Sequence, residues 1–275
     1  MSFITNQPIE GIFGVDKPII GMIHLGPLPG SALYEGDMEA IVKGAVEDAI
    51  ALEAGGVDAV EIENMGDMTY FPGKVGPETV AAMTYVATKV SEKINLPIGI
   101  CVLTDPVAAL AIAHAIGAKF VRATIYTDAV VDVSGVLNAC AHDVQRLKKL
   151  IMDKNTKIFA DVYIKHSAPL TSKPIEYAAK DAVYFLADAV VISGQFTGEE
   201  TPFESVKKVK TANPHISVLV GSGLREENVE RLLAVADGAI VGTAFKEDAK
   251  TFNPVDTTRV QRFMEKVKSL RGRTS

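Results

Sequence analysis

Short apolar runs alternate with helical segments along the whole chain, and this alternation restricts the fold more than any other feature. The runs are rich in β-branched residues and cover 18–24, 57–64, 97–103, 119–126, 157–166, 188–194, 216–222 and 238–243. Each is followed by a helical pattern and then by a glycine or another breaker. Strict alternation predicts parallel strands covered by helices. Eight such units predict a closed (β/α)₈ barrel, the TIM-barrel fold.

Helix-capping residues support these boundaries. Asp37 and the pair Asp105-Pro106 are expected to begin helices, and Gly55-Gly56 to end one. Thr201-Pro202-Phe203-Glu204 is expected to form a capping box. An open Rossmann sheet would need a G-x-G-x-x-G turn after the first strand, and the segment 24–30 does not contain one. The pattern therefore favours the barrel.

Composition restricts the domain organisation, the partners and the cellular compartment that the sequence predicts. The 275 residues contain no Pro/Gly/Ser-rich linker, so we expect a single domain spanning 1–275. The net charge of −6 comes from scattered residues, which argues against nucleic acid as a partner. The start MSFITNQPIEG lacks the basic and apolar regions expected of a signal peptide, and the chain has no apolar run of membrane-spanning length. The two cysteines, Cys101 and Cys140, are typical of a reducing compartment. We therefore expect a cytoplasmic protein without an integral membrane segment, and a homo-oligomer.

Glycine turns follow the last two predicted strands. Gly221-Ser222-Gly223 ends the seventh and Gly242-Thr243 the eighth. In TIM barrels the loops at these two positions commonly bind phosphate. Glycine allows backbone N–H groups to approach an anion, and the two hydroxyl groups offer further donors. Tight turns alone also use glycine, but two such turns in consecutive units predict a phosphate-binding site.

Ionisable residues occur near the carboxyl ends of the predicted strands, where catalytic residues of such barrels lie. Side-chain alternation turns Glu61 and Glu63 of the second strand into the barrel. On the fifth strand the same rule turns Asp161, Tyr163 and Lys165 inward, and His166 follows. The candidate catalytic residues are those nearest the mouth: Glu63, Asp161, Lys165 and His166.

Other polar residues are expected at the same end of the barrel, namely His24, Asp105, Arg122 and Ser193. Two of them have a purely structural alternative. Arg122 is equally suited to a buried ion pair with Glu61, and Asp105 to capping its helix.

The chemistry of these groups stays open at this level. Lys165 is a Schiff-base nucleophile if its pKa is depressed, or, beside Asp161, a cation that stays charged and binds an anionic oxygen. His24, Glu63, Asp161 and His166 together offer ligands for a divalent metal, although no closely spaced metal motif joins them.

Several segments resemble the BtpA/SgcQ family, from GMIHLGPLPGS to NPVDTTRVQRFM, including GGVDAVEIENMGD, KVGPETVAAMT, KIFADVYIKHSAPL, VVISGQFTG, VLVGSGLREENVERLL and DGAIVGTAFK. The resemblance implies a TIM-like barrel without a securely defined reaction. It connects the chain with photosystem I biogenesis and with proteins encoded beside sugar or nucleoside uptake and kinase genes. The chain departs from the family at Cys101 and Thr124, where relatives carry asparagines, so the resemblance does not extend to an identical substrate.

Three functions remain. The first is an enzyme acting on a phosphorylated sugar or a nucleoside phosphate, as an isomerase, an aldolase or a glycosidase-like hydrolase. The second is a barrel that binds flavin mononucleotide (FMN), since the same turns grip that phosphate. The third is a non-catalytic assembly factor. The inward charges Asp161 and Lys165 favour an enzyme over an assembly factor.

Overall fold

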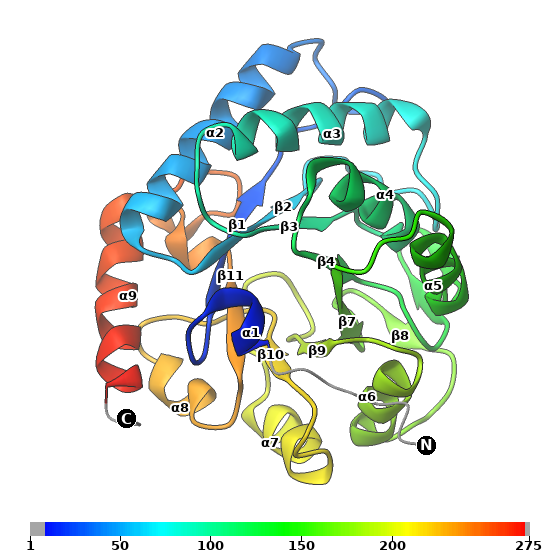
Figure 1. Ribbon diagram of the computed structural model, residues 1–275, viewed down its shortest axis with the longest axis vertical. Coiled ribbons are helices and arrows are strands. Elements are labelled where there is room, and N and C mark those ends of the chain that lie inside the picture. The colour runs from blue at the N-terminus through cyan, green and yellow to red at the C-terminus, as the bar shows by residue number, and fades with distance from the viewer. Residues whose placement is uncertain (1–8, 273–275) are drawn as a thin grey trace.

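The computed structural model describes residues 9–272, which form a closed barrel of parallel strands (Figure 1). The barrel order is β1-β11-β10-β9-β7-β4-β3-β2, and the first and last strands close it with Ile19 opposite Ala239. The strands are β1 (Ile19–His24), β2 (Ala59–Glu63), β3 (Ile98–Cys101), β4 (Phe120–Ala123), β7 (Lys157–Val162), β9 (Ala189–Ile192), β10 (Val218–Val220) and β11 (Gly238–Val241). Each lies within a predicted run, so the predicted fold is confirmed. The first eight residues, and with them most of the segment tested for a signal peptide, lie outside the described part.

Helices surround the barrel (Figure 1). They are α2 (Met38–Gly55), α3 (Pro77–Ser91), α4 (Pro106–Ile116), α5 (Ala141–Leu150), α6 (Ile175–Tyr184), α7 (Phe203–Ala212), α8 (Val229–Leu233) and α9 (Thr257–Arg271). Asp37 and Asp105 cap their helices as predicted, accepting hydrogen bonds from Ala40 N and Ala108 N. Gly56 ends α2 in the left-handed conformation. Within residues 9–272, the helices lack the combination of length and apolar character needed to cross a bilayer.

The predicted capping box at Thr201 is wrong. Helix α7 begins after Pro202, whose side chain has no oxygen that could accept a capping hydrogen bond. The Thr201 hydroxyl instead reaches the carbonyl oxygens of Ile192 (3.1 Å) and Ser222 (2.9 Å). Thr201 therefore ties the ends of β9 and β10 together, a long-range role that local spacing does not reveal.

Side-chain alternation divides the interior into two layers. Outward residues of the strands, such as Val60 and Ile158, pack with the helices in the main apolar core. Inward residues near the amino ends of the strands, including Phe120 and Phe159, form a second apolar cluster. The short helix α1 (Glu10–Phe13) lies across this end in Figure 1, and the Phe13 ring meets Phe120 edge-on at 5.8 Å. The polar inward residues are therefore left at the opposite, carboxyl end.

A small antiparallel sheet, absent from the eight predicted units, lies beside the carboxyl end of the barrel. It has the order β6-β5-β8 and consists of β5 (Val130–Asp132), β6 (Gly135–Leu137) and β8 (Ala168–Pro169). Asp132 accepts hydrogen bonds from the N–H and the hydroxyl of Ser134, which stabilises the turn between β5 and β6. The loops after β4 and β7 are thereby joined.

Strand β7 ends earlier than predicted. It stops at Val162, and Tyr163 has a φ of +58°. The Tyr163 hydroxyl donates to the carbonyl oxygen of Lys173, and its ring packs against the outer apolar core. The prediction that Tyr163 points into the barrel is wrong, because alternation holds only while the backbone stays extended.

Candidate functional site

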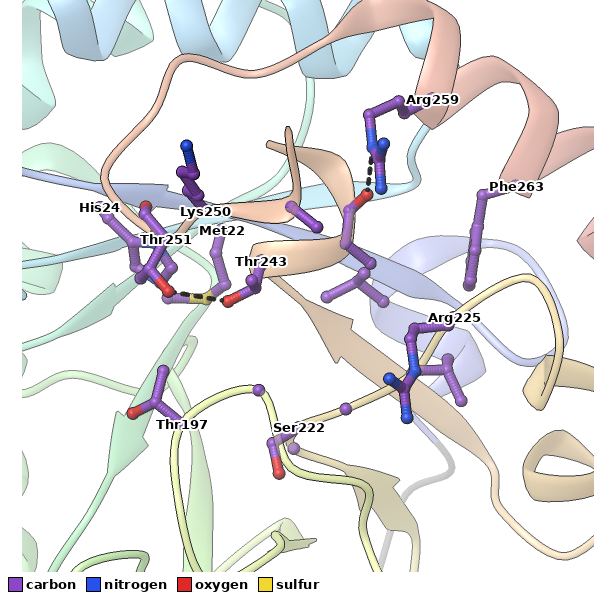
Figure 2. A pocket seen from close by; sticks show the side chains of 18 of the residues that line it. Met22, His24, Thr197, Ser222, Arg225, Thr243, Lys250, Thr251, Arg259 and Phe263 are labelled. Carbon is purple, nitrogen blue, oxygen red and sulfur yellow. Dashed lines mark hydrogen bonds between the residues drawn. The ribbon is translucent and has the colours of Figure 1, made fainter. Parts of the chain in front are cut away.

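A cavity of about 770 Å³ opens at the carboxyl end of the barrel (Figure 2). Its floor includes inward side chains of β1, β2 and β4, and its walls come from the loops after β9, β10 and β11 and from α9. Nine of the predicted site residues line it: His24, Glu63, Arg122, Lys165, Gly221, Ser222, Gly223, Gly242 and Thr243. The topology therefore brings the two glycine turns and several charged candidates into one space.

The turn after β10 forms one wall. Gly223 has a φ of +66°, and a Cβ atom there would lie 2.2 Å from the carbonyl oxygen of Glu199. Only glycine fits this position without moving the neighbouring loop. The Ser222 hydroxyl accepts a hydrogen bond from Gly194 N (2.9 Å) and donates to Glu199 O (3.0 Å). Ser222 thus fastens two loops, and its hydroxyl proton is already engaged.

The turn after β11 forms the facing wall. A Cβ atom on Gly242 would lie 2.8 Å from Cε1 of His24, so the backbone passes directly over that ring. Thr243 begins the 3₁₀ helix η1 (Thr243–Phe245), and its hydroxyl lies 3.0 Å from that of Thr251 (Figure 2). Lys246, just beyond, is buried against Asp48 of α2, which also accepts from Val255 N. This anchor fixes the segment that carries Thr243.

Backbone donors remain available in both turns. Among the described residues, the N–H groups of Gly223, Leu224, Thr243 and Ala244 have no hydrogen-bond acceptor. All four residues line the cavity. Unpaired N–H groups grouped around glycine turns are the usual protein contribution to an anion site.

Three cationic residues that the sequence analysis missed line the same space: Arg225, Lys250 and Arg259 (Figure 2). Arg225 lies 3.7 Å from Glu200, and the Arg259 Nε–H donates to Ala244 O at 3.0 Å. Arg225 follows the Gly-Ser-Gly turn by two residues, a local signal that was available in the sequence. Arg259 arrives from α9, and only the closed barrel brings it to this turn.

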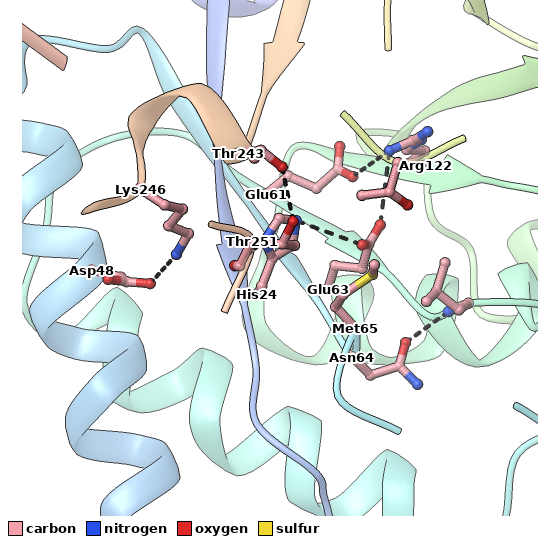
Figure 3. A network of polar contacts seen from close by, with 12 residues as sticks. His24, Asp48, Glu61, Glu63, Asn64, Met65, Arg122, Thr243, Lys246 and Thr251 are labelled. Atoms are coloured by element: carbon pink, nitrogen blue, oxygen red, sulfur yellow. Dashed lines mark hydrogen bonds and ion pairs between the residues drawn. The ribbon is translucent and has the colours of Figure 1, made fainter. Parts of the chain in front are cut away.

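The floor carries an ionic network (Figure 3). Arg122 donates from Nε and Nη2 to the two carboxylate oxygens of Asp161, each at 2.9 Å. Its Nη1 lies 3.7 Å from Glu61 and 3.8 Å from Glu63. The expected pairing of Arg122 with Glu61 is therefore a longer contact, and Asp161 is the direct partner. Asp161 lies beneath the cavity, and its two hydrogen bonds with Arg122 hold that side chain in position.

The two glutamates of β2 differ in their electrostatics. Glu61 is fully buried, and the burial raises its pKa to about 8 despite the opposing effect of Arg122. For Glu63, burial opposes ionisation, but the charges of His24 when it is protonated, of Arg122 and of Lys165 outweigh it and lower its pKa. Glu63 also reaches the cavity, whereas Glu61 lies deeper. The cavity therefore faces an ionised carboxylate.

His24 is held as a neutral imidazole. Burial lowers its pKa to about 4, against the opposing effect of Glu63. Its Nδ1 lies 3.3 Å from the carbonyl oxygen of Thr251, which only accepts hydrogen bonds. Nδ1 therefore carries the proton of the neutral ring, and Nε2, 3.8 Å from Glu63, presents a lone pair.

Of the four remaining predicted site residues, Lys165 lines the cavity and the other three do not. The pKa of Lys165 is lowered by burial and by Arg122. His166 is exposed and lies 3.1 Å from the Thr197 hydroxyl. Asp105 caps α4 and also accepts from Val75 N. Ser193 lies beneath the Gly221 turn, where a Cβ atom on Gly221 would be 2.5 Å from its Oγ.

The metal set considered from sequence does not assemble in this structure. His24 and Glu63 approach each other, but Asp161 is bound to Arg122 and His166 lies outside the cavity lining. The four side chains therefore do not share one coordination sphere.

Similarity to known proteins extends over nearly the whole chain. The family model described as BtpA family matches residues 15–269. The chain belongs to the BtpA family. It is 34% identical to the photosystem I biogenesis protein BtpA of Synechocystis, covering 92% of this chain and 88% of the relative. It is 36% identical to the putative sgc region protein SgcQ of Escherichia coli, covering 96% and 98%. An uncharacterized protein of Thermococcus kodakarensis is 39% identical, covering 93% and 97%. The resemblance seen in the motifs is thus confirmed.

Solved structures share the fold of this BtpA-family chain at low sequence identity. The N-(5'-phosphoribosyl)anthranilate isomerase of Pyrococcus furiosus aligns with a TM-score of 0.55 at 15% identity, covering 92% of this chain and 99% of that one. Thiamine phosphate pyrophosphorylase of the same organism aligns with a TM-score of 0.56 at 14% identity, covering 92% and 96%. At these identities the likeness supports the barrel fold.

Proposed function

We propose that the cavity binds a phosphorylated small molecule and that the protein acts on it as an enzyme. The observation that carries this proposal is the pair of glycine turns facing one cavity with unpaired backbone N–H groups. Gly221, Ser222 and Gly223 supply one side of the phosphate site and Gly242 and Thr243 the other. Arg225, Lys250 and Arg259 add positive charge, which an anionic group would neutralise.

The reacting end of the substrate is proposed to lie over the floor. There His24 offers an unprotonated Nε2, Glu63 a carboxylate, and Lys165 an amine whose pKa is lowered. A neutral base beside such an amine suits proton transfer next to a carbonyl group, either directly or through a Schiff base on Lys165. Asp161 acts as a positioning residue through Arg122. His166 lies outside the cavity lining and is at most a residue of the outer loop.

This arrangement favours an isomerase or an aldolase over a glycosidase-like hydrolase. Glycoside hydrolysis usually employs two carboxyl groups that both face the substrate. Of the floor carboxylates, Glu63 lines the cavity while Glu61 and Asp161 do not. Two structural neighbours carry phosphorylated compounds in their names, a phosphoribosyl anthranilate and thiamine phosphate, which supports a sugar phosphate or nucleoside phosphate as the substrate class.

Ligand binding can be tested by thermal unfolding with ribose 5-phosphate, fructose 6-phosphate, AMP and their unphosphorylated counterparts. A ligand at 100 times its Kd adds about 2.7 kcal/mol to stability, which corresponds to roughly 5–10 °C in Tm. We expect phosphorylated compounds alone to raise Tm. Equal shifts from the unphosphorylated compounds would overturn the proposed site.

A matched pair of variants locates the binding. Gly223→Ala introduces a Cβ atom at a positive φ, 2.2 Å from Glu199 O, and should abolish the ligand-induced shift. Gly36→Ala also has a positive φ, +91°, but its Cβ atom meets nothing within 4 Å and Gly36 is not part of the cavity lining. It should retain the shift. A full shift in Gly223→Ala would place the phosphate elsewhere.

Catalysis is tested on any compound that binds. Lys165→Met and Glu63→Gln should each lower kcat by at least about 100-fold, the usual contribution of a positioned acid or base, while leaving the ligand-induced Tm shift. Borohydride reduction with substrate should add to Lys165 the mass of the substrate less one oxygen atom if a Schiff base forms, because the condensation expels water and the reduction adds two hydrogens. Full turnover in both variants would exclude these residues from the chemistry.

A second candidate is a non-catalytic assembly factor, which the name of the Synechocystis relative favours. It predicts binding of a phosphorylated ligand without conversion of any compound tested. Flavin mononucleotide is a third occupant of the same phosphate site. Visible flavin absorbance of the purified protein, lost in Gly223→Ala and kept in Gly36→Ala, would identify it.

A further inference from the structure

Three potential metal ligands meet inside the barrel beneath the cavity. Glu61 and Glu63 lie two residues apart on β2, and Cys101 of β3 is the register partner of Glu63. Alternation therefore directs all three side chains inward. One ligand atom from each lies within 4.8 Å of the others.

Glu61 is the least satisfied member of this cluster. Its side chain is 0% exposed, and neither carboxylate oxygen has a hydrogen-bond partner among the described residues. Burying a carboxylate without donors is costly unless a cation or a hydrogen bond compensates it. A cation held among these side chains would compensate this carboxylate.

Arg122 does not fill that role. Two of its nitrogens donate to Asp161, so those two charges largely neutralise each other. Its third nitrogen lies 3.7 Å from Glu61 and 3.8 Å from Glu63, beyond hydrogen-bond distance. Arg122 therefore leaves both carboxyl oxygens of Glu61 without a hydrogen bond.

We propose that Glu61, Glu63 and Cys101 bind one divalent transition-metal ion of the zinc class. Thiolate sulfur favours zinc-like ions, whereas magnesium and calcium prefer all-oxygen sites. Binding breaks the S–H bond of Cys101 and the O–H bond of the protonated Glu61 carboxyl, releases both protons to solvent, and forms one metal–sulfur bond and metal–oxygen bonds to the two glutamates. Glu63 lines the cavity, which gives the ion a route of entry from that side.

Cobalt(II) reports on the sulfur ligand directly. The metal-free protein, prepared with a chelator and kept reduced, is titrated with Co²⁺ and its near-ultraviolet spectrum recorded. We expect one ion per chain with a thiolate-to-cobalt charge-transfer band. The chain has two cysteines, so Cys140→Ser leaves Cys101 as the sole thiol and provides the matched control. The band should persist in Cys140→Ser and vanish in Cys101→Ser.

Absence of the band in the wild-type protein, or its loss in Cys140→Ser, would overturn the proposal even if Cys101→Ser does not fold. Competition with Zn²⁺ should remove the band at stoichiometric concentration, and excess Mg²⁺ should not. Glu61→Gln should weaken Zn²⁺ binding by at least about 10-fold. Unchanged affinity in that variant would contradict the three-ligand site. No phosphorylated compound is present in these experiments, so their outcome is independent of the proposed enzyme activity.

Discussion

Replacement of Glu61 by glutamine should change how stability depends on pH. The folded-state pKa of this carboxyl is raised from 4.5 to about 8, with burial as the main cause. In metal-free protein, the folded state therefore holds a proton that the unfolded state loses above pH 4.5. The contribution of Glu61 to stability is complete below pH 4.5 and is lost as the pH rises to about 8.

The size of the effect follows from the same interval. From 4.5 to about 8, at about 1.36 kcal/mol for each pH unit, the loss amounts to about 5 kcal/mol. Glutamine has nearly the same shape and does not titrate. Its amide carries a desolvation cost that is the same at every pH. The free energy of unfolding of Glu61→Gln should therefore rise relative to the wild type by about 5 kcal/mol between pH 4.5 and 8.

The assay is urea unfolding of both proteins at several pH values, with a chelator present throughout. Glu47→Gln is the control, because it removes an exposed carboxylate from a surface pair with Lys43 at 3.8 Å. Its stability curve should run parallel to that of the wild type. A Glu61→Gln curve parallel to the wild type would refute the reasoning, since it would mean that Glu61 is ionised in the folded state at neutral pH.

Three further predictions concern neighbouring features. Asp161→Asn leaves the buried Arg122 without its charged partner and should cost about 3–5 kcal/mol, measured as a lower urea midpoint; a change below about 0.5 kcal/mol, as for an exposed pair, would contradict the described contact. The pKa of His24 is lowered from 6.5 to about 4 in the folded state, so the unfolded state takes up a proton first as the pH falls. Acidification from pH 6.5 to 4 should therefore lower the free energy of unfolding of the wild type by about 3 kcal/mol more than that of His24→Gln. Identical profiles of unfolding free energy against pH would show that the ring is not held neutral. Phe13→Ala removes the ring that covers one end of the barrel and should cost about 2 kcal/mol, less than a fully buried phenylalanine, as judged by Tm; an unchanged Tm would mean that α1 does not stabilise the barrel.

Some expectations failed because contact partners are set by the fold. The inward direction of Arg122 and Asp161 follows from alternation along each strand, but their pairing depends on the register between β4 and β7, where Arg122 lies opposite Phe159. The sequence suggested Glu61 for Arg122 and Lys165 for Asp161. In the structure Arg122 and Asp161 satisfy each other, which leaves Lys165 facing the cavity and Glu61 without a hydrogen bond.

The sequence by itself determined the barrel, the direction of its strand residues and the glycine turns after β10 and β11. These are local properties, because strand periodicity and turn chemistry operate over a few consecutive residues. Only the tertiary structure brought Arg259 to the Gly242 turn and Cys101 beside Glu61. Barrel closure and register decide which distant segments meet, and the burial that follows sets the charge that each group carries.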